Sequence, residues 1–395
     1  MNLRMLDDLD LNGKKVFLRL DLNVPIKDGR ITDETRLLEA IPTIRYILER
    51  THKVAIGSHL GRPDGAVDLK YSLEPVGVRL AELLDREVCF VSDYMQEPYD
   101  QTLGQLSPNQ LVLLENLRFH AGETSNDPDF CRHMARGIEV YVDDAFGTAH
   151  RAHASTVGIP ELIPSQRRGA GLLIDKELKA LGGILERPEA PFTVIMGGAK
   201  VSDKIAVMLS LINHCNHLLI GGAMAYTFLK FKGVAVGKSR VEVDRMDLVE
   251  SIFRSAEARR VQIHLPVDHG AASAFSEQAK REEVDSASLP AGLMGLDIGP
   301  KTVAAYSSVV SRSRTVFWNG PMGVFEWPAF ASGTMAMAQA VAACSGRTVV
   351  GGGDSVAALN KAGVASKVTH VSTGGGASLE YLEGRTLPGL KVLMR

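Results

Sequence analysis

The sequence predicts an α/β protein with two domains, each built around a parallel sheet. Short apolar strands alternate with amphipathic helices along the whole chain, which is the pattern of α/β units. The length of 395 residues is typical of two domains rather than one. The strands of the first half end in polar and basic residues, whereas those of the second half end in glycines. We therefore expect two domains with different ligands.

The composition excludes several classes of protein. A net charge of −2 argues against a general nucleic-acid coat, which is normally basic. The four cysteines are scattered, without a C-x-x-C pair, and this suits a reducing cytoplasm. The N-terminus carries charges where a signal peptide needs an apolar run, and no stretch has the ~18 apolar residues of a membrane span. We expect a cytoplasmic protein with neither nucleic acid nor membrane as partner.

The first half contains four strands with polar ends. They lie in KKVFLRLDLNVP (14–25), HKVAIGSHLGRP (52–63), QLVLLENLRF (110–119) and EVYVDDAFGTAHRAH (139–153). The carboxyl ends of parallel strands meet at one edge of a sheet, where ligands bind. These ends supply arginines, histidines and amides, and guanidinium groups match the oxygens of carboxylates and phosphates. The first half is therefore predicted to bind a small, highly anionic ligand.

A helix is predicted to connect the halves. Pro160 and Pro164 end the first half, and residues 172–185 have the apolar spacing of a helix. Pro188 and Pro191 close it. The domain boundary is placed near residue 170.

The second half repeats a strand, then glycines, then a helix. The pattern occurs in FTVIMGGAK (192–200), HLLIGGAMAYTFL (217–229), RTVVGGGDSVAAL (347–359) and VTHVSTGGGASLEYL (368–382), with a further strand in TVFWNGPMGVFE (315–326). Such junctions direct backbone N–H groups toward phosphate oxygens. Lys200 and Lys204, four residues apart, are expected on one helix face. His264 and His269 are expected in loops. This half is predicted to bind a nucleotide.

A compact anion in one half and a nucleotide in the other favour phosphoryl transfer. That chemistry needs alignment, charge neutralisation and usually Mg²⁺. A carboxylate acceptor is already ionised at pH 7, so no general base is required.

Nine stretches, in order, resemble phosphoglycerate kinases nearly end to end. They are RLDLNVP (19–25), SHLGRPDG (58–65), LLENLRF (113–119), DAFGTAHRAHAST (144–156), GGAKVSDKI (197–205), GLDIGP (295–300), WNGPMGVFEW (318–327), GGGDS (351–355) and STGGGASLE (372–380). The resemblance implies two Rossmann-like domains joined by a helix and hinge across a central cleft. It also implies reversible in-line phosphoryl transfer from 1,3-bisphosphoglycerate to MgADP after domain closure, giving 3-phosphoglycerate and MgATP, by a monomer.

The resemblance divides the chain into a 3-phosphoglycerate-binding domain (1–169), a nucleotide-binding domain (170–378) and a tail (379–395) that returns to the first domain. It assigns substrate binding to Asp21, Asn23, Arg36, His59, Arg62, Arg118 and Arg151. Catalysis is assigned to Arg36, Lys200, Lys204, Gly375 and Gly376. The nucleotide-binding set is Lys204, Gly221, Gly222, Gly295, Leu296, Asn319, Pro321, Val324, Glu326, Gly352, Gly353, Asp354 and Ser355, and Asp354 also holds Mg²⁺.

Two positions and one segment depart from the family pattern, and two alternatives stay open. The segment LPVDHGAASAF (265–275) departs after Pro-Val-Asp and is expected to be peripheral. Asp143 stands where the family commonly has Asn, and Arg240 stands where it commonly has Leu, at the edge of the adenine pocket. One alternative is a catalytically silent nucleotide-binding protein on the same fold. Another is a nicotinamide-dependent dehydrogenase, which the missing G-x-G-x-x-G after a strand opposes.

Overall fold

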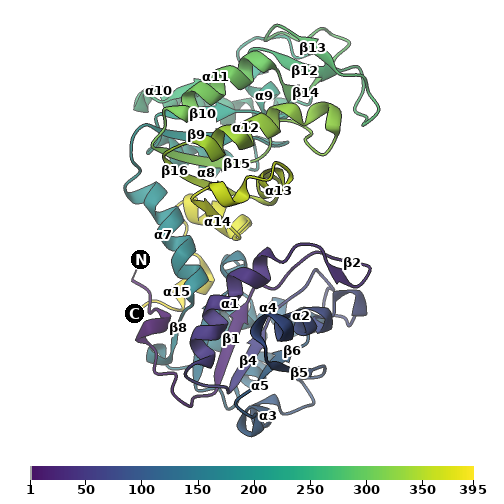
Figure 1. Cartoon of the computed structure of the whole chain (residues 1–395). Coiled ribbons are helices and arrows are strands. Elements are labelled where there is room, and N and C mark those ends of the chain that lie inside the picture. Colours follow the sequence, from purple (N-terminus) through teal and green to yellow (C-terminus); the bar gives the residue numbers. More distant parts are fainter. Residues whose placement is uncertain (1) are drawn as a thin grey trace. The chain divides into compact units, whose positions relative to one another are not determined.

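The computed structural model describes residues 2–395, which form two compact units (Figure 1). Unit 1 holds the residues up to Leu178 together with Thr386–Arg395, and unit 2 is Lys179–Arg385. Each unit has a six-stranded parallel sheet, which confirms the predicted fold class. Among the described residues, no helix has both the length and the apolarity needed to cross a membrane.

The sheet of unit 1 has the order β5-β6-β4-β1-β7-β8. Its strands are β1 (Val16–Leu20), β4 (Val54–Gly57), β5 (Glu87–Val91), β6 (Gln110–Leu114), β7 (Val140–Asp144) and β8 (Arg168–Ala170). A short hairpin of β2 (Ile26–Lys27) and β3 (Arg30–Ile31) follows β1. Later strands extend the sheet on both sides of β1, so the connections after β1 and β7 diverge, which is where open α/β sheets bind ligands.

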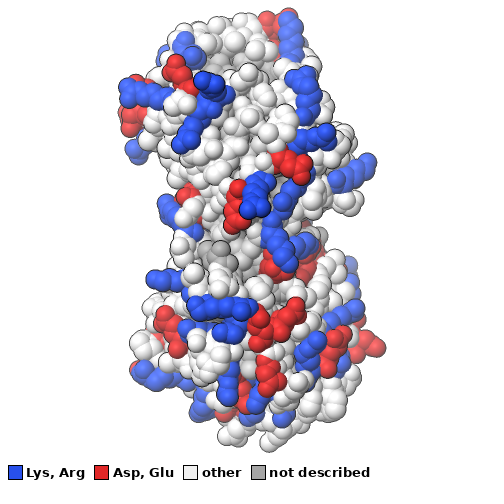
Figure 2. Space-filling model, turned by 90° about the vertical axis from the view of Figure 1, so that its left-hand side faces the viewer, with Lys and Arg blue, Asp and Glu red and all other residues white. Residues whose placement is uncertain are grey.

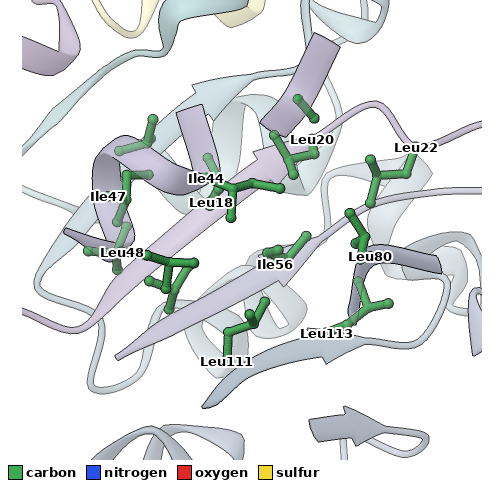
Figure 3. Packing of buried hydrophobic residues seen from close by; sticks show 14 of the residues in the cluster. Leu18, Leu20, Leu22, Ile44, Ile47, Leu48, Ile56, Leu80, Leu111 and Leu113 are labelled. Carbon is green, nitrogen blue, oxygen red and sulfur yellow. The ribbon is translucent and has the colours of Figure 1, made fainter. Parts of the chain in front are cut away.

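The central strands of unit 1 are buried on both faces, as expected for a parallel sheet. Leu18 and Leu20 of β1 and Ile56 of β4 pack in one cluster with Ile44 and Ile47 of the first helix, α1 (Thr35–Leu48) (Figure 3). This apolar layer fixes the strand ends that carry the polar residues.

Further helices surround this sheet, and the chain end completes the unit. They are α2 (Glu74–Leu84), α3 (Tyr99–Gln105), α4 (Ala121–Ser125), α5 (Pro128–Ala135), α6 (Ile159–Leu162) and α15 (Pro388–Lys391). A π-helical turn, Ala154–Gly158, precedes α6. Gly389 of α15 donates to the carbonyl of Ala149 at 2.8 Å, and Leu3 bridges Met394. Both described ends of the chain therefore belong to unit 1.

The sheet of unit 2 has the order β11-β10-β9-β15-β16-β17. Its strands are β9 (Phe192–Met196), β10 (His217–Ile220), β11 (Gln262–His264), β15 (Thr315–Asn319), β16 (Arg347–Gly351) and β17 (His370–Val371). The chain first extends the sheet on one side of β9 and then resumes on its other side with β15. The reversal places the ends of β9 and β15 next to each other, with Met196 opposite Asn319.

The helices of unit 2 follow its strands. They are α8 (Ile205–Ile212), α9 (Met224–Phe231), α10 (Met246–Arg259), α11 (Pro300–Ser311), α12 (Ser332–Ala343), α13 (Gly353–Lys361) and α14 (Gly376–Leu382). The predicted connecting helix is present as α7 (Leu172–Glu186), and the division between the units falls within it. On the face shown in Figure 2, basic and acidic side chains are interspersed.

Unit 2 also contains a three-stranded antiparallel sheet that the sequence interpretation missed. It comprises β12 (His269–Ala272), β13 (Glu282–Val284) and β14 (Met294–Ile298), in the order β13-β12-β14. The expectation that His264 and His269 lie in loops is therefore wrong. His264 is in β11, and the buried His269 is in β12, where its Nδ1 lies 3.2 Å from the hydroxyl of Tyr226.

Candidate functional site

The residues after β1 form the first part of an anion site in unit 1. Asp21 directly follows the strand, and its Oδ1 lies 2.5 Å from Nη1 of Arg36, in the first turn of α1. Asn23 Oδ1 accepts a hydrogen bond from the backbone N–H of Gly61, 2.9 Å away. The carboxylate thus holds the guanidinium of Arg36 at the end of β1. The side chain of Arg36 is 31% exposed and can be reached by a ligand.

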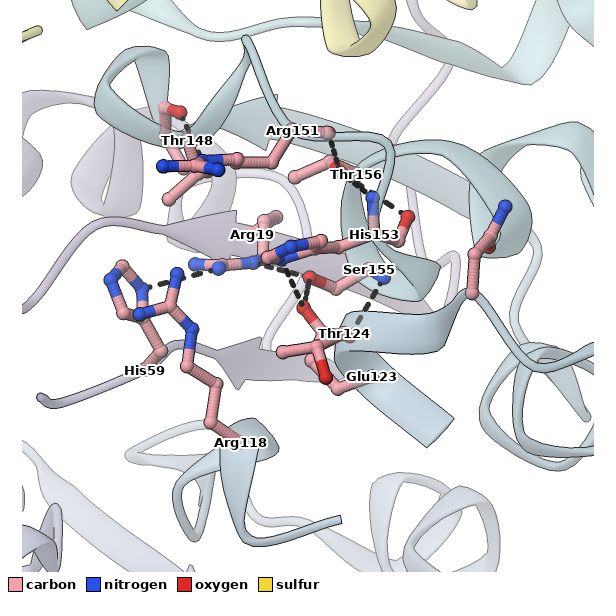
Figure 4. Close-up of polar contacts among 12 residues, drawn as sticks. Arg19, His59, Arg118, Glu123, Thr124, Thr148, Arg151, His153, Ser155 and Thr156 are labelled. Carbon is pink, nitrogen blue, oxygen red and sulfur yellow. Dashed lines mark hydrogen bonds and ion pairs between the residues drawn. The ribbon is translucent and has the colours of Figure 1, made fainter. Parts of the chain in front are cut away.

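A buried hydrogen-bond network lies beside them (Figure 4). Arg19, in β1, is completely buried, although it carries a charge. Its Nε donates to Ser155 Oγ at 2.7 Å, and Ser155 Oγ donates to Glu123 Oε1 at 2.6 Å. On the other side, Nη2 of Arg19 lies 3.3 Å from Nδ1 of His59. These contacts join residues that follow β4 and β7, the two neighbours of β1 in the sheet.

Burial and neighbouring arginines keep the two histidines of this site neutral. Burial, followed by the charges of Arg19 and Arg118, lowers the pKa of His59 well below its usual value. The same causes lower the pKa of His153 to about 4. Burial also lowers the pKa of Arg118 to about 10, so this group stays charged at pH 7. The positive charge of the site therefore comes from its arginines.

The other predicted arginines of unit 1 differ in exposure. Arg118 donates through Nη1 to the carbonyl of Gly61 at 2.9 Å, while its buried Nε has no partner among the described residues. Arg62 and Arg151 are exposed, and Figure 4 shows the side chain of Arg151 above that of Arg19. The site thus presents one fixed buried arginine and several accessible ones, an arrangement that suits a phosphate or carboxylate.

Asp143 lies at the end of β7 beside Asp144. Both are completely buried. Burial raises the pKa of each carboxyl group to about 7. Asp143 accepts from the backbone N–H of Ala145 at 2.9 Å, and Asp144 accepts from that of Ile174 at the start of α7, at 3.0 Å. The two carboxyl groups therefore brace the end of β7 and the start of α7.

In unit 2 the structure corrects one expectation about Lys200 and Lys204. They do not share a helix face, because α8 begins only at Ile205. Lys200 is exposed in the preceding loop. Lys204 lies at the N-cap position, and its Nζ donates to the carbonyls of Gly197 and Asn319 at 2.7 and 3.0 Å. The glycines after β9 break the helix pattern that the spacing of the two lysines suggested.

Lys204 lies in a cavity of about 260 Å³ at the ends of β15 and β16. The cavity is lined by Lys204, Asn319, Gly320, Gly352, Gly353, Asp354, Ser355, Gly375, Gly376 and Leu379. Burial, opposed by the charge of Asp354, lowers the pKa of Lys204 to about 8. The N-termini of α13 and α14, at Gly353 and Gly376, both open here. One ammonium group and two helix N-termini make this cavity suitable for phosphate groups.

A larger pocket of about 500 Å³ shares Asp354 with this cavity. It is lined by Gly198, Ala199, Gly222, Ala223, Tyr226, Lys238, Arg240, Phe275, Met294, Gly295, Leu296, Asp297, Pro321, Met322, Gly323, Val324, Glu326 and Asp354. Apolar walls with a few polar groups are typical of sites for aromatic ligands. The two hollows together can hold a nucleoside beside its phosphate chain.

Two glycines of the pocket region leave no room for a side chain. Gly222 has a φ of +66°, and an added Cβ would lie 2.5 Å from the nitrogen of Gly198. Gly320 has a φ of +99°, and its Cβ would lie 2.2 Å from the carbonyl oxygen of Gly197. Gly221, which lines neither hollow, donates its N–H to the carbonyl of Met196 at 2.8 Å. The backbone itself forms this part of the site.

Asp354 fits the way in which proteins hold Mg²⁺ beside a nucleotide. In the part of the chain that the structure describes, no three metal-ligating side chains come together. Mg²⁺ is commonly held by one or two carboxylates together with substrate phosphates rather than by a protein cage. The exposed carboxylate of Asp354, in the first turn of α13 and next to the phosphate-sized cavity, matches this type of site.

Some residues of both sites were missed by the sequence interpretation. Glu123 and Ser155 lie far apart in sequence from Arg19, and no local pattern joins them. Lys238 belongs to GVAVGKS (233–239), which resembles a phosphate-binding P-loop but is one residue too short, yet Lys238 still lines the larger pocket. Phe275, 65% exposed, also lines this pocket and contacts Trp327, with ring centroids 4.6 Å apart.

Comparisons with known proteins agree with this geometry. The family model described as phosphoglycerate kinase matches residues 6–385. The phosphoglycerate kinase of Anaeromyxobacter sp. (strain Fw109-5) is 51% identical over 396 residues, covering 100% of both chains. That of Leptospira biflexa serovar Patoc (strain Patoc 1 / Ames) is 48% identical over 394 residues, covering 100% of this chain and 99% of the relative.

Solved structures show the same likeness. The phosphoglycerate kinase of Coxiella burnetii has a TM-score of 0.88 and 39% identity, covering 99% of this chain and 98% of that one. The enzyme of Pyrococcus horikoshii OT3 has a TM-score of 0.85 and 34% identity, covering 98% of both chains. With the matched family model and these relatives, the chain belongs to the phosphoglycerate kinase family.

Proposed function

We propose that the two sites divide between them the reaction of the phosphoglycerate kinase family. The chain is a phosphotransferase with a carboxyl group as acceptor, and it transfers a phosphoryl group reversibly between 1,3-bisphosphoglycerate and ADP, giving 3-phosphoglycerate and ATP. One observation supports the division above all others. Unit 1 has an anion site built from side-chain cations, and unit 2 has a phosphate-sized cavity built mainly from backbone.

In unit 1, we assign the glycerate end of the substrate to Asp21 and Asn23. The remote phosphate is assigned to His59, Arg62, Arg118 and Arg151. Arg36 neutralises the charge that develops on the transferring oxygens, because it can leave Asp21 when a ligand competes for it. The carboxylate of 3-phosphoglycerate is ionised at neutral pH, so no residue needs to remove a proton from it.

In unit 2, the larger pocket receives the nucleoside and the smaller cavity its phosphates. Gly222, Gly295, Leu296, Pro321 and Val324 line the nucleoside site, and Glu326 accepts from the ribose hydroxyls. Gly221 lies behind this pocket against Met322, and Asn319 lines the smaller cavity instead. Lys204, Gly352, Gly353 and Ser355 bind the phosphates, while Gly375 and Gly376 offer N–H groups to the group in transfer. Lys200, which is exposed in the loop before α8, is assigned to the phosphoryl group as it moves between the substrates. Asp354 holds Mg²⁺, which neutralises phosphate charge.

Transfer requires that the two bound substrates meet, so we propose hinge bending about the helix that joins the domains. Exclusion of water would then protect the acyl phosphate from hydrolysis. We further propose that the protein acts as a cytoplasmic monomer, with small molecules as its only partners in catalysis. The scattered thiols and the absence of C-x-x-C pairs support the cytoplasmic assignment.

The test is ADP production from MgATP with 3-phosphoglycerate, and unphosphorylated glycerate serves as the parallel control. We expect turnover only with the phosphorylated acid, because the arginines of unit 1 need a remote anion. Turnover with both acids would remove the remote phosphate from the role of these arginines. No turnover with either, despite MgATP binding, would favour the catalytically silent alternative.

A further inference from the structure

We propose that Glu123 is a positioning residue for the anion site of unit 1. Acting through Ser155, it fixes the guanidinium of Arg19, and Arg19 in turn fixes the tautomer of His59. The inference rests on the proposed function, because it takes 3-phosphoglycerate as the ligand of this site. None of the roles assigned above uses Glu123 or Ser155.

The direction of each hydrogen bond in the network is determined by the carboxylate. Glu123 is completely buried, and its two oxygens accept from the N–H and the hydroxyl of Ser155, at 2.9 and 2.6 Å. A carboxylate can only accept, so the single hydroxyl hydrogen of Ser155 points to Glu123. The oxygen of that hydroxyl is therefore left to accept from Nε of Arg19 at 2.7 Å.

The other end of the Arg19 guanidinium determines which ring nitrogen of His59 carries the proton. A guanidinium has only donors, so its Nη2, 3.3 Å from Nδ1 of His59, requires that Nδ1 be the acceptor. The neutral ring then carries its proton on Nε2. Arg19 also donates through Nη1 to the carbonyl of Leu20, so the guanidinium is held at three corners. A ligand thus meets a donor at His59 whose orientation was set in advance.

The direction in which the affinity for 3-phosphoglycerate changes distinguishes a positioning role of Glu123 from an electrostatic one. A buried carboxylate near an anion site repels the anion, so removing its charge alone would strengthen binding. Removing a group that positions the donors would weaken binding. In Glu123→Gln, one of the two acceptor oxygens becomes an NH₂ group, so either the backbone N–H or the hydroxyl of Ser155 loses its acceptor. Ser155→Ala deletes the link and leaves Nε of Arg19 without its acceptor.

The experiment compares Glu123→Gln, Ser155→Ala and the double variant with the parent, by calorimetric titration of 3-phosphoglycerate and of MgADP. We expect the dissociation constant for 3-phosphoglycerate to rise about tenfold in each single variant, the scale of one lost charge-assisted hydrogen bond. The double variant should lose no more than a single one, because both act through the same link. The affinity for MgADP should stay within about twofold of the parent, since its proposed site is in unit 2.

A stability control uses Leu103→Ala. Leu103 is a completely buried residue of α3, a helix that contacts Lys15 at the opposite end of β1 from Asp21 and supplies no residue of the hydrogen-bond network. Its melting temperature should fall while binding of 3-phosphoglycerate is kept. Tighter binding or unchanged binding in Glu123→Gln, or additive losses in the double variant, would overturn the inference. A parent protein that fails to bind 3-phosphoglycerate would instead overturn the proposed function.

Discussion

The two units bind anions by opposite means. Unit 1 presents side-chain cations, ordered by hydrogen bonds among Arg19, Ser155 and Glu123. Unit 2 presents backbone groups, shaped by glycines such as Gly222 and Gly320, with the ammonium of Lys204 among them in the phosphate cavity. The difference shows that one sheet architecture supports two kinds of recognition. Long side chains can follow a ligand that changes charge, whereas backbone amides offer a fixed cradle.

The largest effect should come from the cation of unit 1 that is proposed to act in the reaction. Arg36→Ala should lower kcat by about a hundredfold or more, with little change in MgATP affinity, because its charge is used on the transferring group. Steady-state kinetics in both substrates would measure this. Arg30→Ala, an exposed arginine in the nearby hairpin, is the matched control and should keep its activity. Equal turnover in the two variants would remove Arg36 from the mechanism.

Adding one methyl group tests the backbone cradle of unit 2. In Gly222→Ala the Cβ would meet backbone atoms of Gly198 at 2.5 and 2.6 Å, so the loop must move. We expect MgADP affinity to fall about tenfold or more, while 3-phosphoglycerate binding is retained, as titration of each ligand would show.

The matched control for this change is Gly233→Ala. Gly233 also has a positive φ, +79°, but no atom lies within 4 Å of the added Cβ. It should lose about 1 kcal/mol of stability through backbone strain and keep its nucleotide affinity. Equal losses of affinity in both variants would mean that strain, and not the close approach of backbone, explains the effect.

Neutralising the carboxylate of Asp354 at the phosphate cavity should have a smaller effect, and this effect should fall on the Mg²⁺ requirement. Asp354→Asn should raise the Mg²⁺ concentration needed for half-maximal activity about tenfold, because a neutral amide is a weaker ligand for Mg²⁺. A titration of activity with Mg²⁺ at fixed ATP would measure the shift. Asp203→Asn is the control, because Asp203 is an exposed carboxylate near Lys204 that does not line the cavity. An unchanged Mg²⁺ requirement in Asp354→Asn would contradict the metal assignment.

The pH dependence of nucleotide binding gives the smallest effect. Burial lowers the pKa of Lys204 to about 8, so its charge is complete well below that pH and is lost as the pH rises through it. Nucleotide affinity should therefore fall by about threefold to tenfold between pH 7.5 and 9, because the bound phosphate keeps on Lys204 the proton that the free protein releases in this range. Lys204→Met should bind weakly at every pH. Affinity of the parent that stays constant across this range would contradict the role of the ammonium.

The same pKa has a consequence for stability. The unfolded lysine keeps its proton up to its ordinary pKa, near about 10.4, whereas the folded one releases it near about 8. The unfolded state therefore binds more protons between these values. The contribution of Lys204 to the free energy of unfolding should rise with pH across this window. Comparison of denaturant unfolding in the parent and in Lys204→Met would isolate it.

The sequence predicted the features that depend on neighbours along the chain. Apolar strand runs, the helix at residues 172–185 and the glycines at strand ends follow from local periodicity and backbone freedom. The start of α8 was missed, because the spacing of Lys200 and Lys204 suits a helix, while Gly197 and Gly198 favour a loop. The contact of Arg19 with Ser155 spans 136 residues and arises only from the order of the strands.

The antiparallel sheet was missed for a similar physical reason. Its strands are short, and β13 is largely exposed, so the period-two pattern is weak. Pairing of β12 with β14 across more than twenty residues stabilises them, and no local propensity reports such a pairing. The larger pocket depends on this segment, because Phe275, Met294 and Gly295 line it. The side of the pocket lined by these three residues was therefore harder to predict than the side built from glycines that follow strands.

Unit 1 contains both the beginning of the chain and its last ten residues, Thr386–Arg395. Leu387 and Leu390 in that segment are completely buried. A ribosome therefore completes every residue of unit 2 before it supplies the final piece of unit 1. During translation, unit 1 therefore stays incomplete until the whole of unit 2 has been synthesised. A stop codon only a few residues early would damage the domain that was begun first.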